Sequence, residues 1–222
     1  VISKDKKSVD LVTDTITPSI WQPNKSNGLI QKIAKKTILF KNATLWTNEE
    51  IGIVNSADIV ISNGKILAIG KNLDKTQIPN FENLNIEITD ATGKHITSGI
   101  IDEHSHIAIS KGVNESSQAV TAEVSIADVI NPDDHNIYRQ IAGGVTCSQL
   151  LHGSANPIGG QSALVKLRWG GSAEDMKIKN CDGFIKFALG ENVKQSNWGS
   201  FNTTRFPQTR MGVEQVFFDA FY

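Results

Sequence analysis

The chain has 222 residues, of which 39% are hydrophobic and 20% are charged, and its formal net charge is −1. This composition is typical of a folded protein, and the near-zero charge gives no basis for binding nucleic acid or an anionic membrane. No apolar run approaches the roughly 20 residues that a membrane-spanning helix needs. The two cysteines, Cys147 and Cys181, lack the close spacing of a metal-binding pair, so we expect ordinary buried or half-buried side chains.

The first 36 residues are polar and contain Pro18 and Pro23, which is typical of a linker or an extended arm. From residue 37 onward, short runs of β-branched and aromatic residues indicate strands. Asn63-Gly64 is a strong signal for a two-residue hairpin. We therefore predict a small antiparallel β domain over residues 37–97, with strands at residues 37–46, 57–62, 65–70 and 84–89.

After Gly99 the pattern changes to alternating strands, loops and helices. The segment Asn131-Pro-Asp-Asp134 carries side chains that favour a helix start, and Gly143-Gly144 favours its end. Strands that alternate with helices predict βα units and a parallel sheet. The predicted strands are residues 100–107, 145–151 and 183–189, and the predicted helices are residues 132–142 and 208–222. The last helix reaches Tyr222 without a terminating signal, which is typical of a piece of a longer protein.

The tripeptide His104-Ser105-His106 is the feature with the most direct chemical meaning. Side chains alternate between the two faces of a strand, so two histidines one residue apart point the same way. The preceding Gly99-Ile100-Ile101 predicts the start of a buried strand. Two imidazoles on one side of a strand end are suitable ligands for zinc or a similar divalent ion. The alternative is a pair of hydrogen-bonded, structural histidines in a turn.

The run Gly99-Ile-Ile-Asp-Glu-His-Ser-His106, between a β domain and a series of βα units, resembles the first barrel strand of the metal-dependent amidohydrolase superfamily. Residues 63–70 are similar to the N-terminal sandwich of that family. Residues 143–146, 151–161 and 184–192 are similar to its imidazolonepropionase-like branch. The resemblance implies an α/β fold, with an incomplete antiparallel β-sandwich over residues 37–97 and a partial (β/α)8 TIM barrel over residues 98–222.

Length sets a limit on this resemblance. A complete barrel takes about 250 residues, whereas only 125 residues follow Thr97. We therefore expect a truncated barrel, in the N-terminal part of a larger family member. The family's general-base Asp lies on the last barrel strand and is expected beyond Tyr222, so no catalytic residue is assigned within the chain.

The resemblance implies that His104 and His106 are metal ligands. It offers Glu191, at the end of the third predicted strand, as a further ligand, with a substrate contact or a structural hydrogen bond as alternatives. Lys186 as a carbamylated bridging ligand is another alternative, although its position within a strand disfavours it. Asp102 is expected on the same side as the two histidines, one layer deeper.

Substrate contacts are expected from the glycine-rich loop after the second predicted strand. His152 ends this strand, on the face where barrel active sites form. Asn156 and Gln161 follow it in the loop and are the other expected substrate contacts. The alternative is that His152 only packs against Asn156 or Gln161.

The function implied by the resemblance is hydrolysis of C–N bonds in amides, cyclic amides or peptide-like substrates by a metal-activated water. The expected cofactor is a divalent metal, with zinc favoured. The alternative is a non-catalytic fragment or scaffold that lacks the complete metal site. The expected partners are a small-molecule or peptide-like substrate and a second copy of the chain. Large family members are often exported, but the sequence shows no signal peptide, so the compartment stays open.

Overall fold

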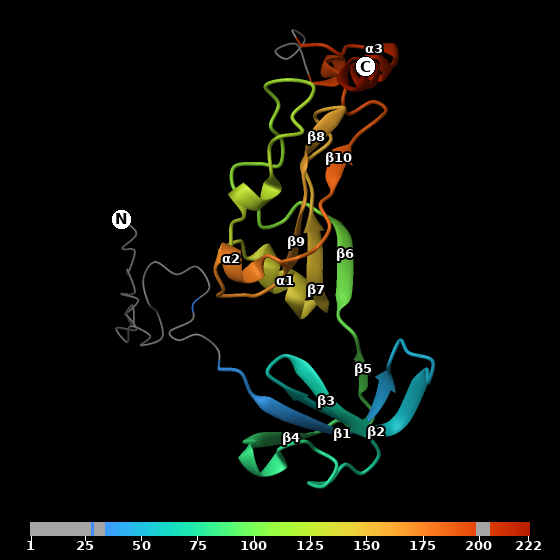
Figure 1. Ribbon diagram of the computed structural model, residues 1–222, viewed down its shortest axis with the longest axis vertical. Helices are drawn as coiled ribbons and strands as arrows, with labels where there is room; N and C mark the ends of the chain where they lie inside the picture. Colours follow the sequence, from blue (N-terminus) through green and yellow to red (C-terminus); the bar gives the residue numbers. More distant parts are fainter. Residues whose placement is uncertain (1–27, 29–33, 199–204) are drawn as a thin grey trace, which may run out of the picture.

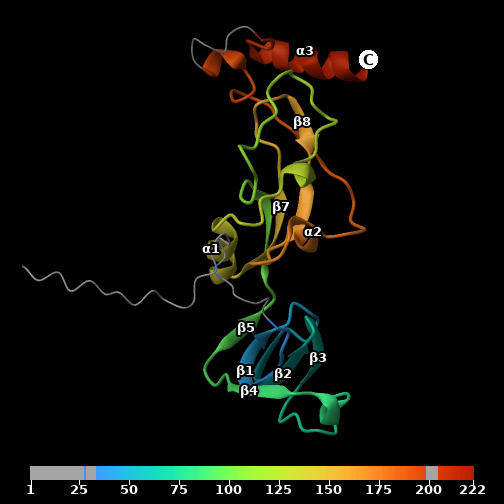
Figure 2. The same ribbon diagram turned by 90° about the vertical axis from the view of Figure 1, so that its left-hand side faces the viewer.

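The computed structural model describes residue 28, residues 34–198 and residues 205–222. Figure 1 shows two regions that lie end to end along the long axis of the molecule, and the turned view in Figure 2 shows the same arrangement. The first region is a sheet formed by β1 to β5. The second holds β6 to β10 and the helices, and the link from β5 to β6 joins the two. Most of the arm predicted over residues 1–36 lies outside the described residues.

The first region is one five-stranded sheet with the order β3-β2-β1-β4, in which β5 also pairs with β1. Asn63 and Gly64 have φ angles of 51° and 77°. These left-handed conformations are those of a type I′ hairpin turn, so the predicted hairpin between β2 and β3 is confirmed. The strands are β1 (Thr37–Trp46), β2 (Ile53–Ser62), β3 (Lys65–Gly70), β4 (Ile86–Asp90) and β5 (His95–Thr97).

The predicted antiparallel arrangement of this sheet is wrong for two of its pairings. Only β2 runs antiparallel to β1, whereas β4 and β5 both run parallel to it. The reason is the connection after β3. Residues 71–85, which include the short 3-10 helix η1 (Phe81–Asn83), cross from the β3 edge to the opposite side of β1. A parallel pair needs such a crossover, and the polar sequence of this segment carries no signal for it.

The second region confirms one predicted βα unit. Strands β6 (Ile100–Ser105) and β7 (Val145–Leu150) are parallel, and α1 (Asn136–Ala142) lies between them in sequence. Gly143 and Gly144 follow α1 directly, as predicted. The helix begins four residues later than predicted, because the Asp134 carboxylate accepts from the Ala108 and Asn136 amides and thereby holds the approach to the helix.

The rest of this region departs from a parallel sheet. After β7, the chain forms β8 (Ile158–Gln161) and β9 (Ala163–Lys166), and β9 pairs antiparallel with β7. The predicted third strand at residues 183–189 is reduced to β10 (Ile185–Phe187), which pairs antiparallel with β8 in a separate two-stranded sheet. Its predicted parallel pairing is therefore wrong, because the β8–β9 segment occupies the free side of β7. The mixed α/β class itself is confirmed.

The remaining elements are short, apart from the last helix. That helix, α3, spans Arg210–Phe221, close to the predicted 208–222, and the Thr209 side chain caps it by accepting from the Gly212 amide. Within the described ranges, no helix combines the length and apolar character needed to cross a membrane. The others are η2 (Ile126–Val129), α2 (Ala173–Met176) and η3 (Gln195–Asn197).

Strand β6 was predicted to be buried, and this prediction is wrong. Ile100 is 56% exposed and Ile101 is 70% exposed. The reason is position, since β6 is the edge strand of the three-stranded sheet β6-β7-β9. The main core of the region instead lies around Ile137, Leu150, Val165 and Met176, each of which is fully buried. Cys181 is likewise exposed rather than buried.

Candidate metal-binding site

His104 and His106 lie at the end of β6 and face each other. Their Nε2 atoms are 3.3 Å apart, and their ring centroids are 5.2 Å apart in an edge-to-face arrangement. Strand alternation explains the shared side, because the intervening Ser105 points to the opposite side and is buried. Both imidazoles are exposed, so the pair opens to the surface of the described structure.

The ring of His106 is held in a defined orientation. Its Nδ1 atom lies 3.0 Å from the Leu151 carbonyl oxygen, which can only accept, so the ring donates its Nδ1 proton. In the neutral ring, this bond leaves Nε2 without a proton and free to bind a metal. Partial burial lowers the pKa of His106, as do the neighbouring His104, Lys186 and His152, while the bond to Leu151 acts in the opposite direction. The lowered pKa favours the neutral ring.

Two further side chains lie at the pair. The Asp102 carboxylate accepts from the backbone amide of His104 at 3.2 Å, so Asp102 fixes the backbone beside the histidines. The ammonium nitrogen of Lys186, in the centre of β10, is 3.5 Å from Nε2 of His104. Its position within a strand disfavoured this lysine as a ligand, yet the pairing of β10 with β8 brings it to the histidines.

Glu191 lies in a different group of charges. Its carboxylate forms ion pairs with Arg210 at 2.6 Å and with Lys194 at 2.7 Å. Bonds from Lys194, Arg210 and Asn197 lower its pKa to about 2. In the part of the chain that the structure describes, no group of three or more His, Cys, Asp and Glu side chains could hold a metal ion. The structure therefore does not bring Glu191 to the histidine pair, and its role as a ligand stays a prediction.

The predicted substrate residues His152 and Asn156 are buried and bonded within the loops. Nδ1 of His152 bonds the Gly153 carbonyl at 2.8 Å, and Nε2 accepts from the Glu115 amide at 2.8 Å. Asn156 donates to the Glu115 carbonyl and to the Thr121 hydroxyl. Gln161 is exposed and donates to the Ala122 carbonyl. The hydrogen bonds of His152 thus go to Gly153 and Glu115 and not to Asn156 or Gln161, and the substrate contacts of the three residues stay predictions.

His152 nevertheless contributes to a cavity. About 530 Å³ of space lies between the loop at residues 110–115 and the segment at residues 123–129, with His152 in its wall. Glu115, Glu123 and Asp128 also line this cavity. The lining therefore includes three acidic residues and Lys111 as well as the buried His152.

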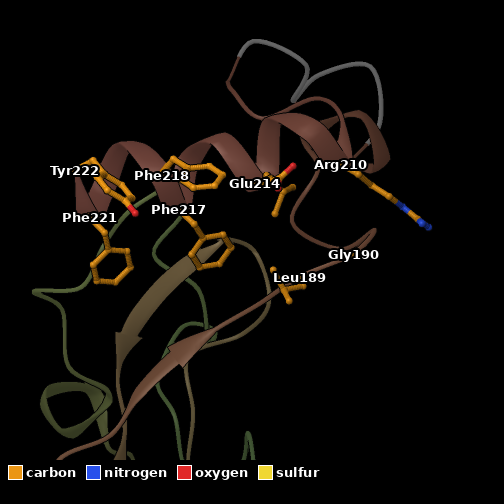
Figure 3. Close-up of a pocket in the computed structure, with 9 residues that line it drawn as sticks. Leu189, Gly190, Arg210, Glu214, Phe217, Phe218, Phe221 and Tyr222 are labelled. Carbon is orange, nitrogen blue, oxygen red and sulfur yellow. The ribbon is translucent and has the colours of Figure 1, made fainter.

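A separate apolar cavity of about 610 Å³ lies against α3. In Figure 3 the rings of Phe217 and Phe221 lie on the same side of the helix, with Phe217 the nearer of the two to Leu189, while the Arg210 side chain points away from them. None of the predicted site residues lines this cavity. It is thus distinct from the histidine pair.

Sequence reasoning missed Arg205 at this end of the molecule. Its guanidinium bonds three carbonyl oxygens and the Asn156 side chain. Arg205 and Asn156 are 49 positions apart in the sequence. No local pattern around Arg205 gives a signal for this contact.

Comparison with known proteins places the chain. No family model matches it. It is 33% identical over 217 residues to the amidohydrolase tasK of Hapsidospora irregularis, covering 84% of this chain and 21% of that protein. It is 35% identical over 57 residues to an imidazolonepropionase of Geobacillus sp. (strain WCH70), covering 26% of this chain and 13% of that protein.

A solved structure supports the same relationship. The crystal structure of an amidohydrolase from Thermotoga maritima MSB8 matches with a TM-score of 0.67 and 36% identity, over 83% of this chain and 46% of that one. The chain thus spans less than half of the length of these relatives. Over the part that it spans, the chain is a homologue of the amidohydrolases, and the superfamily resemblance seen in its sequence is confirmed.

Proposed function

We propose that this chain carries part of the metal site of a hydrolase that cleaves C–N bonds. The observation that carries the proposal is the 3.3 Å separation of the two Nε2 atoms. Two nitrogens that each lie at 2.0–2.1 Å from a tetrahedral zinc ion are about 3.3 Å apart. The relatives named D-hydantoinase, allantoinase and dihydroorotase support the class of reaction.

The donor set fits a divalent ion of the zinc type. Both ligands are imidazoles, which suit zinc well. The Nδ1 proton of His106 is donated to the Leu151 carbonyl, which is the usual support for a histidine that binds a metal through Nε2. The Asp102 carboxylate accepts from the backbone amide of His104 and so steadies the backbone beside that histidine. His104 and His106 would therefore hold the ion, with zinc as its identity.

A catalytic zinc site takes three protein ligands and an open position, so the pair needs a further donor. Lys186 is the nearest candidate, at 3.5 Å from His104. As an ammonium it repels a cation, but addition of carbon dioxide to the neutral amine, with release of one proton, forms a carbamate that supplies oxygen ligands. Glu191 remains a second candidate. Uptake of ¹³C-labelled bicarbonate by the wild type, and its loss in Lys186→Arg, would support the carbamate.

When bound, a divalent ion supplies a Lewis acid that polarises the substrate carbonyl and acidifies a water molecule. In this chain, Leu151 orients the imidazole of His106, and Asp102 holds the backbone of His104. The proposed substrate is an amide, a cyclic amide or a peptide-like molecule. In the larger architecture that we propose, β6 and β7 begin a (β/α)8 barrel, and β1 to β5 form part of a β-sandwich.

The test is metal analysis of the full-length protein, of which we propose this chain to be a part, combined with hydrolysis assays on a panel of amides, cyclic amides and dipeptides. We expect bound zinc and activity in the wild type, and loss of both in His104→Ala and His106→Ala. His135→Ala is the matched control, because this side chain is 68% exposed and lies in the approach to α1. Full activity in a metal-free preparation would contradict the proposal.

A second candidate function is a non-catalytic module of the amidohydrolase fold. It is favoured by the finding that the described residues supply only two of the expected ligands as His, Cys, Asp or Glu. This candidate predicts that the 222-residue chain binds zinc weakly and hydrolyses nothing. Hydrolysis of any substrate in the panel by the 222-residue chain itself would exclude it.

A further inference from the structure

A buried network of polar side chains connects the loop that follows β7 to the segment that contains Glu115 and Thr121. Asn156 is 0% exposed, Thr121 1% and His152 1%. A buried polar group without a partner is destabilising, so the bonds among these side chains matter for the local structure. Arg205 lies at one end of this network and His152 at the other.

Arg205 binds two loops at once. Its Nη1 atom lies 2.8 Å from the Ser116 carbonyl oxygen, 2.7 Å from that of Gln118 and 2.9 Å from the Asn156 side-chain oxygen. Its Nη2 atom lies 3.0 Å from the Ala155 carbonyl oxygen. The planar fork of a guanidinium can reach these acceptors together, whereas an ammonium cannot reproduce the arrangement. The indole ring of Trp198 lies 5.5 Å from the guanidinium carbon.

Asn156 connects Arg205 to the loop that contains Glu115, whose backbone contacts His152. Its side-chain oxygen accepts from Arg205, and this contact orients the amide so that its nitrogen donates to the Glu115 carbonyl at 2.5 Å and to the Thr121 hydroxyl at 2.7 Å. The same Glu115 residue donates its backbone amide to Nε2 of His152. The backbone of Glu115 is therefore held at both its N–H and its C=O group.

The two bonds of His152 define its protonation pattern. Nε2 accepts from an amide, and Nδ1 bonds a carbonyl oxygen that can only accept, so the proton lies on Nδ1. Gly159 and Gly160 make room for this ring. A Cβ atom at Gly159 would lie 2.9 Å from Nδ1 of His152, and one at Gly160 would lie 3.3 Å from Cδ2 of the same ring. The close backbone of the two glycines and the two hydrogen bonds therefore favour one orientation of the His152 ring.

We propose that Arg205 is a positioning residue, which acts through Asn156 and Glu115 to fix the Nδ1-protonated form of His152. A fixed position of His152 would also fix the neighbouring residue Leu151. The carbonyl oxygen of Leu151 orients the ring of His106, so Arg205 would influence the histidine pair as well. Only this last step rests on the proposed function. The constraint on His152 stands on the network alone.

The test uses the protein labelled with ¹⁵N in its histidines and backbone. In the wild type, we expect the nitrogen signals of His152 to show a protonated Nδ1 and a bare Nε2, with slow hydrogen exchange at the Glu115 amide. In Arg205→Met, we expect mixed His152 tautomers and an exchange rate at Glu115 that is faster by about tenfold or more. Arg139→Met is the matched control, since Arg139 is an exposed residue of α1.

Two more variants keep the test decisive if Arg205→Met does not fold. Asn156→Asp keeps the oxygen that accepts from Arg205 but removes the donor to Glu115 and Thr121, so it should give the same His152 signature. Arg205→Lys keeps the charge without the fork, and we expect it to restore the wild-type signature only in part. His152 signals and Glu115 exchange that match the control in the folded variants would overturn the proposal.

A zinc titration of the same samples separates this inference from the proposed function. If the wild type binds no zinc, the proposed metal site fails, while the His152 signals still decide the role of Arg205. If zinc binds, Arg205→Met should weaken its affinity by about 10-fold, as changes outside the ligands themselves typically do. An unchanged zinc affinity together with a changed His152 signature would overturn the last step alone.

Discussion

The two regions of the molecule hold their buried polar groups in different ways. In the first, the hydroxyls of Thr37 and Ser62 meet at 2.7 Å near the paired ends of β1 and β2, so regular strand pairing brings the partners together. In the second, Asn156 and His152 bond the backbone of Glu115, which lies 41 and 37 positions earlier in the sequence. The difference shows where function can reside, because loops held by side chains can present chemistry that a regular sheet does not.

The core of the second region gives the largest expected effect on stability. Leu150 is fully buried beside the loops, so Leu150→Ala should lower the free energy of unfolding by about 2–5 kcal/mol. Leu189→Ala makes the same change at a side chain that is 73% exposed and should change it by less than about 0.5 kcal/mol. Urea unfolding followed by circular dichroism measures both. Equal losses would show that the second region has no defined core at β7.

Asp58 provides the sharpest comparison within the first region, because its buried side chain holds the loop that follows β3. The residue is 3% exposed, and its carboxylate accepts from the Asn42 amide at 2.8 Å and from the Leu73 amide at 2.9 Å. Asp58→Ala leaves these amides without their acceptor, so we expect a loss of about 2–3 kcal/mol. Glu82→Ala, at an exposed site, is the control for the urea measurement. A loss below about 0.5 kcal/mol would show that strand pairing alone holds this region.

The charges at the start of α3 give the smallest expected effect. Lys194, Arg210 and Asn197 lower the pKa of Glu191 to about 2, from an ordinary value of 4.5. Because the folded-state pKa is the lower one, the stabilisation is complete above the ordinary value and is lost as the pH falls toward about 2. The carboxylate is exposed to solvent, so the change is small. Melting temperatures of the wild type and Glu191→Gln from pH 6 to pH 2 should converge at the acidic end. Parallel curves would contradict the ion-pair cluster.

The contrast between local strand patterns and contacts between distant segments also explains how much could be predicted from the sequence. Strand periodicity and the Asn63-Gly64 turn are local signals, and they gave β1, the hairpin and β3 with their bounds. The parallel pairing of β4 with β1 depends on the path of a polar crossover, and no local pattern encodes that path. The exposure of Ile101 depends on which strand lies at the sheet edge, which also is not a local property.

The candidate site likewise combines residues that a local pattern predicts with residues that only the completed fold brings together. His104 and His106 were predictable because two positions on one strand fix their relative direction. Lys186 approaches His104 across 82 positions of sequence, and only the pairing of β10 with β8 brings it there. Arg205 contacts the Ser116 carbonyl across 89 positions. Contacts of this kind depend on the completed fold, so sequence reasoning missed Arg205 and underrated Lys186.

The most direct test of the central claim is a zinc titration of the protein, followed by calorimetry. The wild type should bind zinc at one site, and both His104→Ala and His106→Ala should weaken the affinity by about 10-fold or more. His135→Ala should leave it unchanged, because this exposed imidazole is not part of the pair. Zinc binding of equal affinity in the wild type, His104→Ala and His106→Ala would contradict the assignment of this pair as metal ligands.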